Sequence, residues 1–364
     1  MASVYNAENT AYKTANYPLM LGQSMGLLDT VHRVHPELFD LYKKLKEQDW
    51  SEDEVSLESS RKDFESCPKS ISDVMLETIM WQYVGDSIAA QSIIQTFGPF
   101  ASNTEYFLAL MRWSENESLH ALTYSEIVRL CVKQPKAVLQ RVMENQSVLN
   151  RSQILIEKFD ELKVAGLKYQ LGEEMDEEEL RRTILRGQLA LTGLEALEFM
   201  ASFACTFALA RQGLFIGIAQ LVQKIALDEQ VHVEMNYKIF EILLKDKKWK
   251  ASFNAILPEV KEILDEIVRQ EEMWSDYIFS QGRAIVGLNS TLLKEWVYYN
   301  AQGLYAFLGV PFDFPVIKAH PVPFINEWLN IDMQQNANQE QANTSYKLNT
   351  SVQDFADNEE LDFE

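Results

Sequence analysis

Residues 114–124 read SENESLHALTY and lie within a stretch whose apolar spacing predicts a buried helix. Glu117, His120 and Tyr124 follow one another at steps of three and four residues, so a helix places them on one face. Apolar residues continue this face on both sides, from Leu110 to Cys131. A carboxylate and an imidazole are therefore set among core positions, where an unpartnered polar group costs roughly 2–7 kcal/mol. Other groups must therefore compensate the burial of this carboxylate and this imidazole.

A second pair of ligand-type residues repeats this arrangement farther along the chain. Glu229 and His232 are again three residues apart and interrupt the apolar row of a predicted helix. One more carboxylate interrupts the apolar face of the predicted helix before each pair: Asp86 before Glu117, and Glu195 before Glu229. A single acid-x-x-His pair is weak evidence in an acidic chain. Two helical hairpins that carry acid, acid and histidine in the same order are a specific pattern.

The charge of these residues indicates what compensates them. Four carboxylates in one apolar core carry four negative charges, which only cations can balance. Two divalent metal ions do so, with the neutral imidazoles as further ligands. Carboxylate-rich sites with one histidine per metal suit iron or manganese better than zinc, and helical bundles hold such dinuclear centres. The predicted metal ligands are Asp86, Glu117, His120, Glu195, Glu229 and His232.

Two other acids near such motifs are weaker candidates. Glu198 follows Glu195 by about one turn, in GLEALEF, but leans toward the flank of the helix, so we favour Glu195 as the ligand. Asp29 and His32 have the same spacing as the two pairs, yet they lie in a polar segment that Pro36 cuts short. We therefore interpret Asp29 and His32 as a pair at the surface.

The composition favours helices throughout the chain. Of its 364 residues, 47% are hydrophobic and 24% are charged, and only 14 are glycine and 10 proline. Alternating strand patterns are largely missing, so we expect an all-α bundle. The expected helices span residues 71–97, 102–132, 135–165, 178–212, 214–246, 255–282 and 289–308.

Charge and cysteine content restrict the partners and the compartment. A net charge of −21 argues against binding to nucleic acid, whose phosphates need a basic surface. Cys67, Cys131 and Cys205 have no short spacing, which fits a reducing cytoplasm. The N-terminal segment lacks the apolar core of a signal peptide, and the longest apolar stretch, around residues 199–210, is too short to span a bilayer. We therefore expect a soluble, cytoplasmic protein without membrane association.

The C-terminal residues 333–364 differ in character from the helical domain expected over residues 1–332. They are rich in Gln and Asn, nearly devoid of aliphatic residues and acidic at their end, so we expect them to be disordered in isolation. Phe355, Leu361 and Phe363 lie within the acidic run. The segment is either a solubilising tail or a docking peptide with these three residues as anchors, and we favour docking.

Four motifs carry a resemblance to a known family. The chain resembles the small, radical-generating subunit of class I ribonucleotide reductase from about Trp50 to the tail. Asp86, where ferritins usually have Glu, and Tyr124, one turn beyond His120, support this resemblance. The motifs are YVGDSIA at 83–89, SENESLHALTY at 114–124, GLEALEFMASFACTFA at 193–208 and ALDEQVH at 226–232.

The resemblance implies a ferritin-like bundle with two iron ions, manganese being possible, that reacts with dioxygen and oxidises Tyr124 to a stable tyrosyl radical. By this similarity, Glu117 and Glu229 bridge the metals. Asp86, Glu117 and His120 bind the metal nearer the tyrosine, and Glu195, Glu229 and His232 bind the other.

The resemblance also implies roles for residues beyond the ligands. Asp228 orients His120, Trp50 relays electrons, and Tyr346 in the tail hands the radical across the subunit interface. The apolar pocket around the tyrosine consists of Phe199, Phe203 and Ile225.

The implied enzyme is a ribonucleoside-diphosphate reductase, an oxidoreductase that makes deoxyribonucleotides, with this chain as its beta subunit. The sequence shows no Gly-rich phosphate loop and no plausible redox cysteine pair, so a large catalytic subunit must carry substrate and thiols. We expect the tail to dock that subunit, and the small subunit to form a homodimer.

Two other functions use similar ligands. A stand-alone diiron oxidase or desaturase needs an open substrate channel and no redox tyrosine. A ferritin-like iron-storage protein needs a shell-forming assembly and gives no role to Trp50 or the acidic tail.

Overall fold

The computed structural model describes residues 4–330, and within this range the chain consists of helices and connecting loops. Two isolated bridges, Met20 with Ala101 and Ile285 with Leu288, are the β pairing found among the described residues. The expected all-α class is therefore confirmed. The α-helices are α1 Pro36–Glu47, α2 Glu58–Ser66, α3 Lys69–Phe97, α4 Thr104–Cys131, α5 Pro135–Glu144, α6 Gln146–Arg151, α7 Gln153–Leu171, α8 Glu177–Gly193, α9 Phe199–Ala210, α10 Ile216–Leu243, α11 Lys247–Ala255, α12 Leu257–Ile278, α13 Ser290–Leu308 and α14 Asn326–Leu329.

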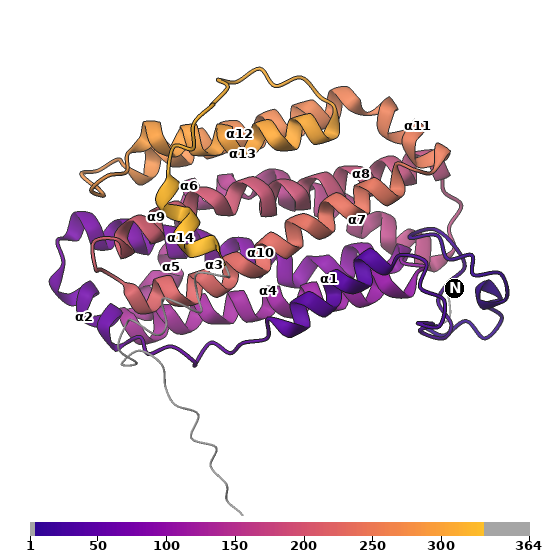
Figure 1. The fold of residues 1–364 in the computed structure, drawn as a ribbon, viewed down its shortest axis with the longest axis horizontal. Coiled ribbons are helices and arrows are strands. Elements are labelled where there is room, and N and C mark those ends of the chain that lie inside the picture. The colour runs from indigo at the N-terminus through magenta and orange to yellow at the C-terminus, as the bar shows by residue number, and fades with distance from the viewer. Residues whose placement is uncertain (1–3, 331–364) are drawn as a thin grey trace, which may run out of the picture.

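Two helical hairpins form the centre of the bundle. The first consists of α3 and α4, and the second of α8 with α9 followed by α10 (Figure 1). Helix α3 packs against α4 and α9, and α10 packs against α9 and α4, so the apolar faces of the two hairpins cover one another. Helices α12 and α13 form an outer layer at the top of Figure 1, and α1 lies along α4 and α10. The centre of this arrangement is shielded from solvent on several sides.

A short, strained turn connects α9 to α10. Phe215, the residue before α10, has a φ of 57°, in the left-handed region that side chains rarely adopt. Its N–H donates to Oδ2 of Asp63 at 2.7 Å, and its buried ring packs on Phe64 with centroids 4.7 Å apart. These contacts with α2 offset the backbone strain and hold α9 and α10 close together.

The predicted helix 135–165 is wrong in one respect, because the structure divides this stretch into α5, α6 and α7. Asn145 has an extended backbone, and its side chain accepts the N–H of Ser147, which starts α6 as an N-cap. Ser152 has a non-helical backbone and separates α6 from α7. The break directs Arg151, the last residue of α6, into the core, where it is 2% exposed.

The predicted helix 178–212 contains an irregular turn. A π-helical turn, Leu194–Glu198, separates α8 from α9. The stretch Glu177–Ala210 is long and apolar enough to cross a membrane, but its most apolar window is entirely buried within the bundle. It is thus a core helix, and its apolar character reflects packing on neighbouring helices.

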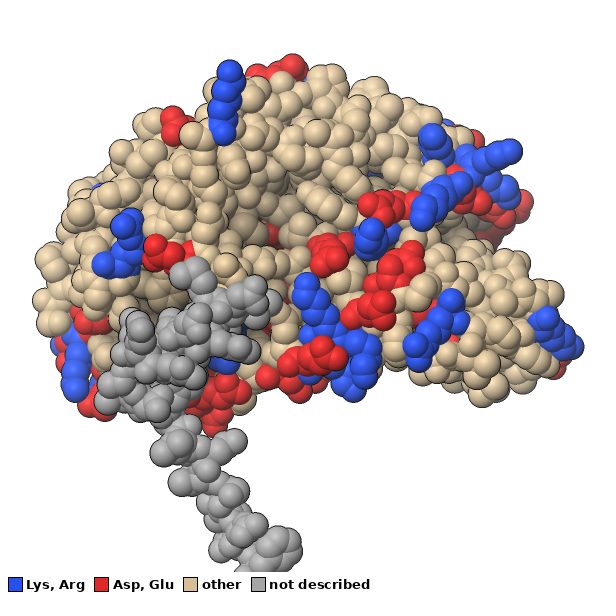
Figure 2. Space-filling view, in the orientation of Figure 1, with Lys and Arg blue, Asp and Glu red and all other residues tan. Residues whose placement is uncertain are grey.

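The C-terminal residues 331–364, including Tyr346 and the three tail anchors, lie outside the described residues. The domain boundary and the docking tail therefore stay predictions. On the face shown in Figure 2, basic side chains are interspersed with acidic ones.

Candidate metal centre

All six predicted ligands meet in the middle of the bundle. They form two groups: Asp86, Glu117, His120 and Glu229, and then Glu117, Glu195, Glu229 and His232. In each group, one ligand atom per residue lies within 4.8 Å of all the others, and every one of the six residues is fully buried. Asp86 comes from α3, the first pair from α4, Glu195 from the π turn and the second pair from α10. The bundle therefore brings together residues far apart in sequence.

Glu117 and Glu229 belong to both groups and lie between the two histidines. Glu229 places Oε1 3.1 Å from Nδ1 of His120 and Oε2 2.8 Å from Nδ1 of His232. Glu117 places Oε2 3.7 Å from Nδ1 of His120 and Oε1 3.1 Å from Nδ1 of His232. Each shared carboxylate thus presents one oxygen to each histidine. This is the arrangement that a bridge between two metal ions requires.

Burial and mutual charge shift the pKa values of these groups strongly. Burial, and then the charge of Glu117, raises the pKa of Asp86 well above its ordinary value; burial and the charge of Glu229 do the same for Glu195. Burial by itself would raise the pKa of Glu229 as well, but His232 and hydrogen bonds to its neighbours outweigh it and lower the value. Asp86 and Glu195 therefore hold their protons more tightly than exposed acids do.

The histidines shift in the opposite sense from ordinary buried imidazoles. Burial by itself would lower the pKa of His120 and His232. The carboxylates around them outweigh burial and raise both pKa values well above the usual range. Neither oxygen of Asp86 makes a hydrogen bond to any described residue, although both are buried. Four buried carboxylates and two inward-facing imidazoles fit two divalent cations, which would replace these protons and satisfy the free oxygens.

A carboxylate behind the cluster orients one of its ligands. Oδ2 of Asp228 lies 3.2 Å from Nε2 of His120, so a hydrogen on Nε2 leaves Nδ1 available for a metal ion. The same oxygen accepts the indole N–H of Trp50 at 2.8 Å and the amide of Asn116 at 3.1 Å. The Trp50 ring stacks on His120 with centroids 6.0 Å apart. Trp50 and Asp228, both predicted from the sequence, therefore lie together beside His120.

Two residues beside the cluster were missed by sequence reasoning. Trp113 donates its indole N–H to Oε1 of Glu195 at 3.0 Å and stacks on His232 at 5.0 Å, as Trp50 stacks on His120. Asn116 hydrogen-bonds Asp228. The sequence contained a sign of both residues. Trp113 lies on the ligand face of α4, and Asn116 precedes Glu117 as Asp228 precedes Glu229.

Tyr124 is fully buried on α4, one turn beyond His120. Its hydroxyl makes no hydrogen bond within the described part of the chain. Burial, and then the charge of Asp86, raises its pKa well above the ordinary value. The three residues predicted to form the apolar pocket are also fully buried, and two of them, Phe199 and Phe203, stack with centroids 6.0 Å apart. Ile225 is the third.

Phe199 packs against α3 at the residue before Asp86. A Cβ built on Gly85 would lie 3.3 Å from Cε1 of Phe199, so the aromatic ring rests against the backbone next to Asp86. A larger residue at position 85 would displace the ring.

Glu198 belongs to neither ligand group. It is fully buried, and the charges that act on it are those of Glu271 and Arg151; burial and Glu271 raise its pKa well above the usual range. The geometry thus groups Glu195, and not Glu198, with the histidines. The Asp29–His32 pair lies apart, with 2.7 Å between Oδ2 and Nδ1 and an imidazole that is 40% exposed.

Comparison with known proteins gives one family. A model of the family described as "Ribonucleotide reductase, small chain" matches residues 30–321. The chain is 28% identical to the ribonucleoside-diphosphate reductase subunit beta of Buchnera aphidicola subsp. Schizaphis graminum, over 95% of each chain. It shares its fold with a ribonucleotide reductase R2 subunit from Clostridium botulinum, with a TM-score of 0.79 at 19% identity, over 91% of this chain and 98% of the other.

The same fold occurs in a protein with another activity. A variant of an R2-like ligand-binding oxidase with a Mn/Fe cofactor matches with a TM-score of 0.60 at 19% identity, over 76% of this chain and 95% of that one. These similarities confirm the expected helical bundle.

Proposed function

The chain belongs to the ribonucleotide reductase small-chain family, the radical-generating beta component of a class I oxidoreductase, and from this premise we propose that Tyr124 carries the radical. The observation that carries the proposal is the position of Tyr124 on the same face of α4 as Glu117 and His120, buried beyond a carboxylate and histidine cluster that fits two metal ions. A small chain is by its nature one component of an enzyme, so the reaction also needs the large chain.

Each group of four ligands would hold one metal ion, and Glu117 and Glu229 would be shared. When bound, the dinuclear centre supplies dioxygen activation and a one-electron oxidant. We propose iron for both positions, with manganese as the alternative, because the donor set suits either metal. Apart from the metal, the chain itself contributes a dry, fixed set of oxygen and nitrogen ligands.

Tyr124 would lose one electron and its hydroxyl proton. The carboxyl group whose charge acts most strongly on the hydroxyl is Asp86. We propose that Asp86 takes up this proton once metal binding has displaced its own. The raised pKa of Tyr124 disfavours loss of the proton alone, so proton and electron leave together. The buried rings of Phe199 and Phe203, which the family resemblance places around the tyrosine, offer no easily oxidised or hydrogen-donating group, which would prolong the life of the radical.

Trp50 and Asp228 would connect the centre to the surface of the subunit. Trp50 is 8% exposed and is joined to His120 both by stacking and through Asp228. An indole N–H that donates to a carboxylate can give up its proton as it gives up an electron. We propose that Tyr346 in the tail and Trp50 relay an electron from the large subunit to the Tyr124 radical, so that the radical passes in the opposite direction, to the large subunit. The proposal extends to a homodimer, to docking through the tail and to a reducing, cytoplasmic setting for the three cysteines, which form no disulfide among the described residues.

The test compares two tyrosines of α4. Tyr124→Phe should bind both metals yet show no tyrosyl-radical absorption or resonance after iron loading in air. Tyr106 is a matched control, because it is also fully buried and its hydroxyl also lacks a hydrogen bond within the described range. Tyr106→Phe should keep the radical. A signal of unchanged shape in Tyr124→Phe would place the radical elsewhere.

The second candidate is a stand-alone oxidase, favoured by the likeness to the ligand-binding oxidase. That function needs no radical on Tyr124 and no large subunit. An iron-loaded wild-type protein that oxidises an organic substrate and shows no tyrosyl radical would support it.

A further inference from the structure

A second buried cluster of charges lies outside the ligand set. Arg151 at the end of α6 and Glu271 on α12 form an ion pair in which Nε and Nη2 of the guanidinium donate to the two carboxylate oxygens, the second at 2.6 Å. The guanidinium carbon lies 3.5 Å from the ring centroid of Trp81 and 4.6 Å from that of Trp274. Two indole rings and a two-pronged carboxylate therefore fix the guanidinium in both position and orientation.

The remaining donors of Arg151 reach the irregular part of a neighbouring helix. Nη2 also donates to the backbone carbonyl of Glu198, and Nη1 donates to Oγ of Ser202 at 3.1 Å. Glu198 is the last residue of the π turn, and Ser202 lies in the first turn of α9. Arg151 thus ties the end of this turn to α12 and to the tryptophan of α3.

The π turn determines where Glu195 points. The N–H of Phe199 reaches back five residues to the carbonyl of Leu194, so this turn is wider than an α-helical turn. In an α-helix, Glu195 and Glu198 would lie close together on one face. Here Glu195 lies in the ligand cluster with His232, whereas Glu198 lies beside Arg151. The wider turn separates the two carboxylates and places only one of them among the ligands.

A π turn is rare and occurs mostly as a single turn within an α-helix, often at a functional site, so contacts with its surroundings can decide whether it is kept. We propose that Arg151 is a positioning residue for Glu195: by holding the Glu198 carbonyl and Ser202, it keeps the π turn in the form that directs Glu195 into the metal cluster. This inference rests on the proposed metal centre and adds a residue that contacts none of the ligands.

The asymmetry of the cluster gives the proposal a specific consequence. Glu195 belongs only to the group that contains His232, while the group with Asp86 and His120 does not use it. Loss of Arg151 should therefore weaken one metal position and leave the other. A role in stability alone would affect both positions alike.

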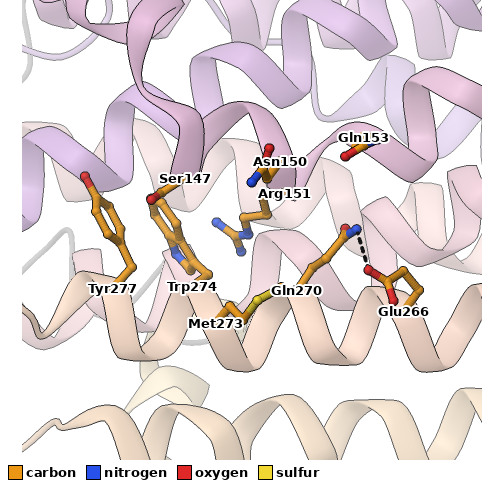
Figure 3. A pocket seen from close by; sticks show the side chains of 9 residues that line it. All are labelled: Ser147, Asn150, Arg151, Gln153, Glu266, Gln270, Met273, Trp274 and Tyr277. Carbon is orange, nitrogen blue, oxygen red and sulfur yellow. Dashed lines mark hydrogen bonds between the residues drawn. The ribbon is translucent and has the colours of Figure 1, made fainter.

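A surface pocket reaches this guanidinium from outside. It has a volume of about 210 Å³ and lies between the α6–α7 junction and α12 (Figure 3). Arg151 is one of the residues that line the pocket, and Figure 3 shows its side chain extending toward α12 beside Trp274. A small planar cation can therefore reach the position of the guanidinium once the Arg151 side chain is shortened.

The first experiment uses Mn²⁺ alone as the probe, counted by equilibrium binding and followed by electron paramagnetic resonance. The parent protein should bind two coupled ions. Arg151→Met should keep one tight ion and lose about 10–100-fold in affinity for the second, the usual effect of disturbing groups behind a metal ligand. A parent protein without two sites would refute the metal centre itself, which is a different outcome from failure of the inference.

Arg283→Met is the matched control. Arg283 is also a buried arginine that donates to backbone carbonyls, those of Ile278 and Tyr277, and it lies 4.5 Å from the Tyr277 ring centroid, but it does not touch the π turn. It should lower thermal stability and keep both Mn²⁺ ions. Two unchanged sites in Arg151→Met, or equal weakening of both sites in the two variants, would overturn the positioning role.

Chemical rescue tests the guanidinium directly. Millimolar guanidinium, far below denaturing concentrations, should restore the second Mn²⁺ ion and its coupled signal in Arg151→Ala, where the pocket opens onto the vacated position. It should not do so in Arg151→Met, whose side chain fills that position. If guanidinium restored the second Mn²⁺ ion in neither variant, the lost affinity would be due to packing, and the role of the guanidinium group would be overturned.

Discussion

The indole N–H of Trp50 donates to Oδ2 of Asp228 at 2.8 Å, which joins the segment after α1 to the middle of the ligand helix α10. The same oxygen holds His120. One carboxylate therefore serves two groups with different proposed tasks, orienting a metal ligand and accepting the proton of a relay tryptophan. Substituting Trp50 and Asp228 one at a time distinguishes these two tasks.

Trp50→Phe should keep both metal ions and abolish turnover with the large subunit, because phenylalanine preserves the stacking on His120 but has no N–H to give. Asp228→Ala should instead lower metal affinity about 10–100-fold, since His120 loses the group that orients it. Metal analysis and a coupled nucleotide-reduction assay measure both. Trp249→Phe, a buried tryptophan on α11, is the control and should retain turnover. Full turnover in Trp50→Phe would remove it from the relay.

Glu195→Gln and Glu198→Gln should have opposite outcomes, although the two residues are three positions apart in one buried turn. Glu195→Gln removes a charged ligand and should lower bound metal below two ions per chain. Glu198→Gln should keep two ions, because Glu198 belongs to neither ligand group and an amide has nearly the same shape as its carboxyl group. Metal content after gel filtration decides between them. Loss of metal in Glu198→Gln would make Glu198 a ligand.

The ligand residues could be predicted from the sequence because their pattern is local and repeated. Glu117 and His120, like Glu229 and His232, occupy one face of a helix at fixed spacing, and polar residues in an apolar row are visible without a structure. Tyr124 is visible for the same reason. The outer partners Trp50 and Asp228 came only from the family resemblance, since the contact between them spans a large part of the chain.

The π turn and the Arg151 cluster could not be predicted from sequence, for physical reasons. Helical periodicity assumes a constant turn, so the sequence places Glu198 only toward the flank of the helix face that carries Glu195, and a widened turn leaves no compositional mark. Arg151 was placed inside a continuous helix over residues 135–165. Its inward position depends on the break at Ser152 and on partners from α3 and α12, which only tertiary packing provides.

Metal binding should release protons and strengthen as pH rises. The pKa values of Asp86, Glu195 and both histidines are raised, so these groups hold protons more tightly than exposed groups do, and metal ions must displace those protons. Calorimetric titration with Mn²⁺ in buffers of different ionisation enthalpy counts the protons. Glu198→Gln should release the same number as the parent, because Glu198 belongs to neither ligand group. Binding without proton release would contradict these pKa shifts.

Whereas the affinity for metal should rise with pH, the stability of the metal-free protein should fall as pH rises. Groups with raised pKa values bind more protons in the folded than in the unfolded chain, so their contribution is present at low pH and is lost as pH rises through the folded-state values. For the two histidines this loss begins above about pH 6.5, the ordinary imidazole value. The lowered pKa of Glu229 acts at acidic pH and does not change this sign. Thermal unfolding of the metal-free protein should occur at lower temperature as pH rises from neutral, and metal loading should remove the trend.

The C-terminal segment should dock the large subunit. Its last residues combine many acids with Phe355, Leu361 and Phe363, and such segments bind by burying a few anchors while their charges steer association. A synthetic peptide of residues 351–364 should compete with the whole chain for the large subunit and inhibit nucleotide reduction. The control peptide carries Ala at the three anchors with the same charge, and it should not compete.

Truncation and Tyr346→Phe separate docking from radical transfer. Removal of residues 351–364 should abolish binding to the large subunit and leave two metals and the Tyr124 signal intact, because the ligand cluster lies wholly within α3, α4, α10 and the π turn. Tyr346→Phe should retain binding and the Tyr124 signal but lose turnover, since only the phenolic hydroxyl is removed from the relay. Sedimentation or calorimetry measures the affinity, and resonance measures the radical. Unchanged affinity after truncation would make the segment a solubilising tail. The proposed role of Tyr346 would then fail as well, because it requires the segment to be held at the subunit interface.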